Sequence, residues 1–206
     1  MLIIPAIDII GGKCVRLLKG NFSLVKEYSK DPLEMAKDFE RAGASRIHIV
    51  DLEGAKLGRP INDKMILEIA QKLNVEVEVG GGIRTFEIAE NYLRNGVKKV
   101  IMGSAALKDI GLLKRLVEVF GADRILVALD LKQGRIMTDG WLEESGKSCE
   151  KFLNDLKRVG IREIIFTDVD RDGTLTIPNL AFLKDLVQYG FNIILSGGVS
   201  DLRSIE

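Results

Sequence analysis

Short apolar segments alternate with amphipathic segments along the whole chain, and this alternation limits the folds open to it. The apolar segments are rich in β-branched residues, which is typical of buried strands, and they span residues 2–7, 47–50, 75–79, 100–102, 125–129, 164–166 and 192–195. Helical periodicity marks segments between them, at residues 32–43, 62–73, 85–96 and 149–160. Because this alternation requires parallel strands joined by helical crossovers, we predict an α/β fold.

The two halves of the chain resemble each other, which favours a closed barrel over an open doubly wound sheet. A shift of 117 residues pairs Asp38 with Asp155, Arg41 with Arg158, Gly43 with Gly160, Ile47 with Ile164, Asp51 with Asp168 and Asn62 with Asn179. At similar offsets Asp8 matches Asp130, and residues 81–82 match residues 197–198. Two halves of four strands make eight parallel strands, so we predict a (β/α)8 TIM barrel built of two half-barrel repeats.

The repeat also predicts the domain organisation. We expect a single domain over residues 1–206, with the first half-barrel at about 1–121 and the second at about 122–206. The second half stops after its third strand. We therefore expect the last βα unit to be missing from this sequence.

Composition argues against several classes of partner. The 30 Lys and Arg residues balance the 30 Asp and Glu residues, so no charge excess indicates nucleic acid or an anionic membrane. No apolar run approaches the roughly 18 residues of a membrane span, and no signal peptide opens the chain, so we expect a cytoplasmic protein with a small-molecule partner. Cys14, Cys149 and the single His48 form no metal-binding pattern, so we expect free thiols and no metal.

Two aspartates at predicted strand ends are candidates for acid/base chemistry. Barrel enzymes carry their active sites at the carboxyl ends of the strands. An Asp after a strand is often only a helix cap or a turn residue. Asp8 and Asp130, however, are each followed by a Gly-containing, hairpin-like stretch instead of a helix. We expect both to face the cavity, where paired carboxyls suit proton donation and abstraction.

Two glycine-rich turns are candidates for phosphate binding. GGGIR at residues 80–84 and SGGVS at residues 196–200 each join a strand end to a predicted helix start, where backbone N–H groups can hold a phosphate. Tight turning alone is the alternative. The predicted phosphate contacts are Gly81, Gly82, Arg84, Gly103 and Ser104 at the first site, with Gly197 and Gly198 at the second. Two such sites imply a long substrate with a phosphate at each end.

Five further residues have both a functional and a structural interpretation. His48 and Thr167 lie on equivalent strand faces and face either the cavity or the barrel packing. Trp141, in a polar stretch, suits stacking on a heteroaromatic ring, with packing in the core as the alternative. Arg16 either pairs with an anionic group or is an ordinary surface residue, and Asp172 either overhangs the cavity or forms a turn.

Seven segments together resemble the histidine-pathway isomerase family that acts on ProFAR, phosphoribosylformimino-5-aminoimidazole carboxamide ribotide. They are IPAIDIIGGKCVRLLKG, HIVDLEGAKLGRPIN, VGGGIRTFE, GS at 103–104, ALDLKQGRIMTDGW, FTDVDRDGTLTIPN and SGGVS. The resemblance covers essentially the whole chain. It implies an Amadori rearrangement that opens one ribose ring and converts an aminoaldose to an aminoketose, without a cofactor.

The resemblance also implies roles for individual residues. Asp8 matches the family's general base and Asp130 the aspartate usually assigned as proton donor, with Thr167 nearby. The family's Asp-Gly-Thr motif falls on Asp172 and Gly173, so Asp172 is a second candidate acid, and the sequence leaves the choice open. Trp141 matches the aromatic residue that stacks on the substrate.

Three departures from the family pattern accompany these matches. Ile177 replaces a common Gly, and the family's last strand with its Gly-Arg-Ala phosphate loop is absent. Bifunctional relatives tend to carry an Arg where this chain has Asp139, so we expect a single substrate. As the assembly state we expect a monomer. The alternatives are the sister cyclase of imidazole glycerol phosphate synthase and a catalytically silent barrel that only binds a bis-phosphate.

Overall fold

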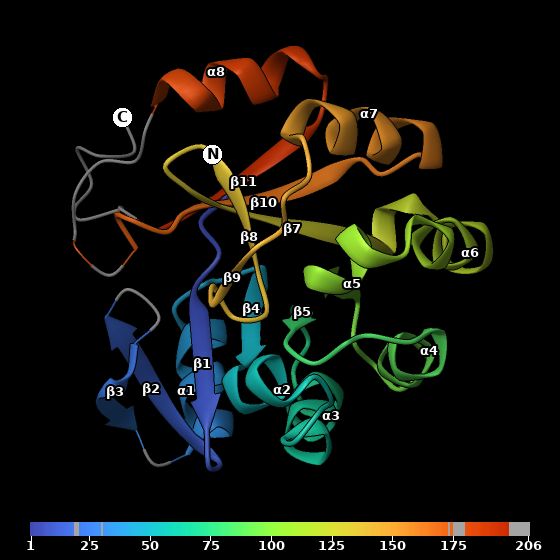
Figure 1. Ribbon diagram of the computed structural model, residues 1–206. Helices are drawn as coiled ribbons and strands as arrows, with labels where there is room; N and C mark the ends of the chain where they lie inside the picture. Colours follow the sequence, from blue (N-terminus) through green and yellow to red (C-terminus); the bar gives the residue numbers. More distant parts are fainter. Residues whose placement is uncertain (19–20, 30, 173, 175–179, 198–206) are drawn as a thin grey trace.

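A curled parallel sheet forms the centre of the protein. The computed structural model describes residues 1–18, 21–29, 31–172, 174 and 180–197. Within them the parallel strands lie side by side in chain order. They are β1 (Ala6–Ile10), β4 (Arg46–Asp51), β5 (Glu76–Gly80), β6 (Lys99–Met102), β7 (Ile125–Lys132), β10 (Glu163–Asp168) and β11 (Asn192–Ser196). The helices lie around the outside of this sheet (Figure 1). This is the barrel arrangement that the alternating sequence predicts.

Two of the parallel strands, β1 and β7, are each followed by short strands that fold back and pair with them in antiparallel orientation. β2 (Lys13–Leu18) pairs with β1 and with β3 (Asn21–Ser29), while β8 (Arg135–Thr138) pairs with β7 and with β9 (Glu143–Glu144). The two hairpins follow Asp8 and Asp130, as the sequence predicts. Strand β3 was not among the predicted elements.

The helices connect successive strands. They are α1 (Pro32–Arg41), α2 (Leu52–Leu57), α3 (Asp63–Lys72), α4 (Phe86–Arg94), α5 (Ser104–Lys108), α6 (Ile110–Phe120), the short 3₁₀ helix η1 (Ala122–Arg124), α7 (Cys149–Val159) and α8 (Leu180–Gln188). Side-chain caps fix several starts: Asp31 accepts from the backbone N–H groups of Leu33 and Glu34 at the start of α1. None of the described helices combines the length and apolar character needed to cross a bilayer.

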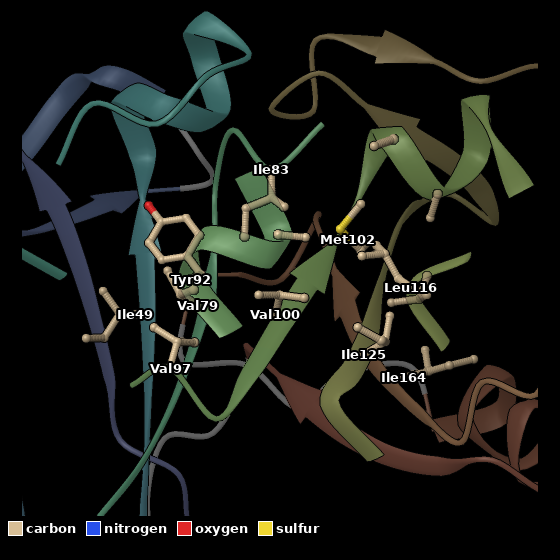
Figure 2. Close-up of a cluster of buried hydrophobic side chains, with 14 of the residues drawn as sticks. Ile49, Val79, Ile83, Tyr92, Val97, Val100, Met102, Leu116, Ile125 and Ile164 are labelled. Atoms are coloured by element: carbon tan, nitrogen blue, oxygen red, sulfur yellow. The ribbon is translucent and has the colours of Figure 1, made fainter. Parts of the chain in front are cut away.

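The main core lies between the sheet and its helices. Figure 2 shows this layer around Ile49, Val79, Tyr92, Met102 and Ile125, all of them fully buried. The opposite faces of the strands line the barrel interior, where Ile101, Leu126 and Ile165 form a smaller apolar cluster. Because side chains alternate along a strand, each strand contributes to both layers.

The register of the strands reproduces the internal repeat. Asp8 pairs with Val50 across β1 and β4, and Asp130 pairs with Thr167 across β7 and β10. Val50 and Thr167 are equivalent under the sequence repeat. The two halves therefore place their aspartates at the same height in the sheet.

The predicted bounds of the first strand are wrong. We expected residues 2–7, but β1 spans Ala6–Ile10. Pairing with the following hairpin extends the strand to Ile10, whereas Leu2 and Ile3 are 52% and 62% exposed. An apolar run predicts burial, but the partner strand decides where pairing begins. The six other predicted strands are present with small shifts, and Cys14 and Cys149 are free thiols, as expected.

Candidate active site

A cavity of about 240 Å³ lies at the carboxyl ends of the parallel strands. Most of the predicted site residues line it, namely Asp8, Arg16, His48, Gly81, Gly82, Arg84, Gly103, Ser104, Asp130, Trp141, Thr167 and Asp172. Gly197 is not among its lining residues, and Gly173 and Gly198 lie outside the described residues. The sequence thus predicted residues from six parallel strands and the segments that follow them, and these residues meet in one place.

Asp8 lies on β1 where the first hairpin begins. Burial raises the pKa of its carboxyl above the ordinary value, and the negative charge of Asp172 raises it further. The positive charges of Arg16 and His48 act in the opposite direction. Asp8 is therefore a desolvated carboxyl whose ionised form is supported by the guanidinium of Arg16.

Asp130 occupies the equivalent position on β7, in different surroundings. Burial raises its pKa, and hydrogen bonds from Trp141 and Thr167 oppose that shift. Thr167 is buried beside it on β10. Asp130 thus has neutral hydrogen-bonding neighbours, whereas Asp8 has Arg16 beside it.

Asp172 contributes a third carboxyl from the loop after β10. Its Oδ1 accepts a hydrogen bond from Arg16 Nη2 at 3.3 Å, and its side chain is only 14% exposed. The guanidinium favours the ionised form of this carboxyl. Arg16 is thus held at the cavity by a carboxylate of the chain itself, while its side chain stays 42% exposed. The negative charge of Asp172 raises the pKa of both other aspartates.

The first glycine turn packs closely against the neighbouring loop. Gly81 has φ +101°, and a Cβ built there would lie 2.1 Å from the carbonyl oxygen of Asp51. A Cβ at Gly82, where φ is +73°, would lie 2.6 Å from the backbone of Arg59. Both glycines are therefore required by the fold itself, whatever they bind.

Asp51, at the carboxyl end of β4, has a structural role. It is fully buried and caps α2 by accepting from Gly54 N–H at 2.8 Å. Its other oxygen accepts from the backbone N–H groups of Ile61 and Asn62 at 2.7 and 2.9 Å. This network fixes the loop against which Gly81 packs.

A carboxylate already occupies the cationic side of the predicted first phosphate site. Asp139 Oδ1 accepts from Arg84 at 2.9 Å and its Oδ2 accepts from Lys108 at 2.8 Å. Its backbone N–H donates to Ser104 Oγ at 2.8 Å. Arg84, which we expect to bind a phosphate, thus already binds an anionic side chain of the chain itself.

The loop that carries Trp141 has an unusual backbone. Asp139, Gly140 and Trp141 have φ values of +52°, +70° and +69° in succession. Non-glycine residues seldom adopt this region, and bonds from Asp139 and Trp141 to the cavity wall hold the loop there. The contacts bring the single tryptophan against Asp130.

Sequence reasoning missed residues in and beside the cavity. Phe22 from β3 and Met137 from β8 line it, and Lys108 pairs with Asp139 at its edge. Glu78 on β5 contacts His48. The alternation of β5 could have found Glu78, since Glu78 lies two residues before Gly80 and so shares its face. Among the described residues, no group of three or more His, Cys, Asp or Glu side chains is arranged to hold a metal ion.

Comparison with known proteins shows to which family the chain belongs. The family described as "Histidine biosynthesis protein" matches residues 2–206. The chain belongs to the histidine biosynthesis protein family. Its (β/α)8-barrel fold is that of the family, and the predicted family resemblance is confirmed.

Three relatives of this chain share one name, 1-(5-phosphoribosyl)-5-((5-phosphoribosylamino)methylideneamino)imidazole-4-carboxamide isomerase. The protein from Halothermothrix orenii is 42% identical over 100% of this chain and 87% of its own length. The protein from Caldanaerobacter subterraneus is 44% identical over 100% of this chain and 85% of its own length. The protein from Geobacillus kaustophilus is 45% identical over 99% of this chain and 83% of its own length. The matching extends over nearly the whole of this chain.

Proposed function

We propose that this chain is an aldose–ketose isomerase that converts ProFAR to its aminoketose by an Amadori rearrangement. One observation carries the proposal: Asp8 and Asp130, from equivalent strands of the two half-barrels, both line one cavity as desolvated carboxyls with raised pKa values. The isomerase name shared by relatives at 42–45% identity agrees with it. The shared name also favours the isomerase over the sister cyclase as the function of this chain.

The chemistry follows from two proton transfers. An acid protonates the ring oxygen of the ribose, so that the C1–O bond breaks and a Schiff base forms. A base then removes the proton from C2 to give an enolamine, which tautomerises to the ketone. No atom is lost or gained, and each proton that leaves the substrate is matched by one that returns.

The surroundings of the carboxyls support one assignment of roles. Asp130 suits the acid, because burial favours its protonated form and its hydrogen-bond partners are uncharged. Asp8 suits the base, because the guanidinium of Arg16 supports its carboxylate. Asp172 is already bound to Arg16, and we assign it the role of holding Arg16 and tuning the other two carboxyls.

Two glycine sites would hold the phosphates, and Trp141 would stack on the substrate. The first site comprises Gly81, Gly82, Arg84, Gly103 and Ser104, and the second includes Gly197 with Gly173 and Gly198. We further propose one substrate, no cofactor, and a cytoplasmic monomer.

A turnover assay of the purified protein with ProFAR tests the proposal. We expect the absorbance change that accompanies isomerisation, in the absence of any added cofactor. Binding of ProFAR without conversion would instead identify a silent bis-phosphate-binding barrel. Size-exclusion chromatography with light scattering tests the monomer.

A further inference from the structure

A layer of charged side chains lies in the barrel interior next to the cavity, and the proposed chemistry uses none of it. Arg46 on β4 donates to Glu76 at 3.2 Å and to Glu78 at 3.4 Å, both on β5. Arg46 also lies 3.5 Å from Glu163 on β10, which binds Lys99 on β6. Most of these ion pairs need no explanation beyond mutual neutralisation of buried charge.

Glu78 makes one contact that neutralisation does not require. Its side chain is fully buried, and its Oε1 lies 2.8 Å from Nδ1 of His48. His48 is two residues beyond Arg46 on the same face of β4 and lines the cavity. Glu78 therefore connects the charged layer to the wall of the site.

His48 is also coupled to the proposed acid and base. A positive charge on His48 lowers the pKa of both Asp8 and Asp130. His48 pairs with Ala6 in the register of β1 and β4, two residues before the pair of Asp8 and Val50. Because side chains alternate along a strand, His48 lies on the same face of the sheet as that pair. The imidazole is thus close enough to influence the reacting carboxyls.

The contact dictates which ring nitrogen carries the proton. An ionised carboxylate only accepts hydrogen bonds, so Nδ1 must donate. The other oxygen of Glu78 accepts from the guanidinium of Arg46 at 3.4 Å, the arrangement of an ion pair with a carboxylate. With Nδ1 held as the donor, Nε2 is the nitrogen left for the cavity.

We propose that Glu78 is a positioning residue that fixes the His48 ring with its proton on Nδ1 and presents Nε2 to a ribose hydroxyl of the substrate beside Asp8. The ligand rests on the proposed function, whereas the tautomer does not. Arg46 orients Glu78 in turn, so the three residues form one hydrogen-bonded chain from the charged layer to the cavity.

The single histidine of the chain makes the tautomer directly measurable. In ¹⁵N-labelled wild-type protein without ligand, long-range ¹H–¹⁵N correlation shows one pair of ring nitrogens. At a pH where the ring is neutral, we expect Nδ1 to have the shift of a protonated nitrogen and Nε2 that of an unprotonated one. A protonated Nε2, or an even mixture, would overturn the proposal without reference to turnover.

Two matched variants separate positioning from charge neutralisation. Glu78→Met removes the acceptor at similar length, and Glu76→Met removes a neighbouring partner of Arg46 on the same strand without touching His48. We expect Glu78→Met to move the tautomer toward protonated Nε2 and to lower kcat about tenfold, the size of one lost hydrogen bond. We expect Glu76→Met to leave both unchanged.

Each remaining outcome counts for or against the proposal. Equal effects of the two variants on kcat would mean that the layer acts only through its charge, and the positioning role would be wrong. A shifted tautomer with unchanged kcat would also contradict it. If Glu78→Met did not fold, the wild-type spectrum would still decide the tautomer, and an inactive wild type would refute the proposed function alone.

Discussion

Asp8 and Asp130 are equivalent in the repeat but differ in their neighbours. Asp8 has the cationic Arg16 beside it, whereas Asp130 is held by Trp141 and Thr167. Paired acid and base groups need surroundings of this unlike kind. Three predictions follow at the scale of single residues.

Asp8→Asn keeps the size of the side chain and removes its basic carboxylate. We expect turnover of ProFAR to fall about 10²- to 10⁴-fold, with substrate binding largely kept because the phosphate sites supply most of the affinity. Steady-state kinetics and a direct binding titration measure the two effects. More than about a tenth of wild-type turnover would exclude Asp8 as the base.

Asp130→Asn and Asp172→Asn distinguish the two candidate acids. We expect Asp130→Asn to lose turnover as severely as Asp8→Asn, because it removes the proton donor. We expect Asp172→Asn to lose less, since Asp172 is bound to Arg16. The reverse order in kcat would reassign the acid to Asp172.

Asp172→Asn should also shift the pH dependence. The negative charge of Asp172 raises the pKa of Asp8 and of Asp130, so its removal lowers both pKa values. The acidic limb of kcat/KM reports the base and the alkaline limb the acid, so both limbs should move to lower pH. A pH–rate profile of the variant that shifts upward, or not at all, would contradict this coupling.

Individual turns and loops between the strands set the geometry of the site. The turn after β5 passes over Asp51 so closely that only glycine fits at residue 81. The loop between β8 and β9 is held by Asp139, which binds Arg84 and Lys108.

Gly81→Ala should destabilise the fold. The new Cβ would overlap the Asp51 carbonyl oxygen in a left-handed backbone conformation, and we expect a loss of about 3 kcal/mol in the free energy of unfolding. Gly43→Ala is the control, because Gly43 has φ +93° with nothing within 4 Å of its Cβ. Denaturant unfolding compares the two, and equal losses would mean that the close approach to Asp51 is not limiting.

Asp139→Asn should strengthen anion binding at the first phosphate site. Removing the carboxylate frees Arg84 and Lys108 from their ion pairs with Asp139. Because ion pairs that are partly open to solvent contribute little free energy, we expect the affinity for inorganic phosphate to rise roughly two- to tenfold. Fluorescence of Trp141, the single tryptophan of the chain, reports the titration two residues away. Asp123→Asn, which loses a pair with Arg162, is the control. An unchanged affinity in Asp139→Asn would mean that Asp139 does not compete with phosphate.

The whole molecule brings the two half-barrels around one cavity. β1 carries Asp8 and β7 carries Asp130, with three parallel strands between them in the sheet. Neither half has both carboxyls, so the proposed pair of proton transfers requires the assembled barrel. The site is a property of the complete sheet and not of one repeat.

Activity should survive exhaustive chelation. Both proposed proton transfers use carboxyls of the chain, so removal of divalent ions should leave kcat within error of its starting value. The comparison is turnover before and after treatment with EDTA and dialysis. Loss of activity that a divalent ion restores would contradict a mechanism by Asp8 and Asp130 alone.

The sequence by itself determined the strand order and the position of the two aspartates. Alternating periodicity indicates parallel strands, and the repeat aligns Asp8 with Asp130 at equivalent strand ends. The alternation appears within short segments and the repeat appears at a nearly constant offset. Both can therefore be recognised in the sequence without knowing which strands pair. The family resemblance added roles that spacing alone does not contain.

Only the tertiary structure decided which side chains meet across strands and loops. Glu78 reaches His48 across 30 residues of sequence, Arg16 reaches Asp172 across 156, and Asp139 reaches Arg84 across 55. These contacts depend on strand register and on loop conformation, and a shift of one residue would turn a strand's side chains to the other face. Pairing with the hairpin also set the end of β1 at Ile10, beyond its predicted end. Such long-range geometry forms only when the sheet assembles, which is why the residue types could be predicted but not their partners.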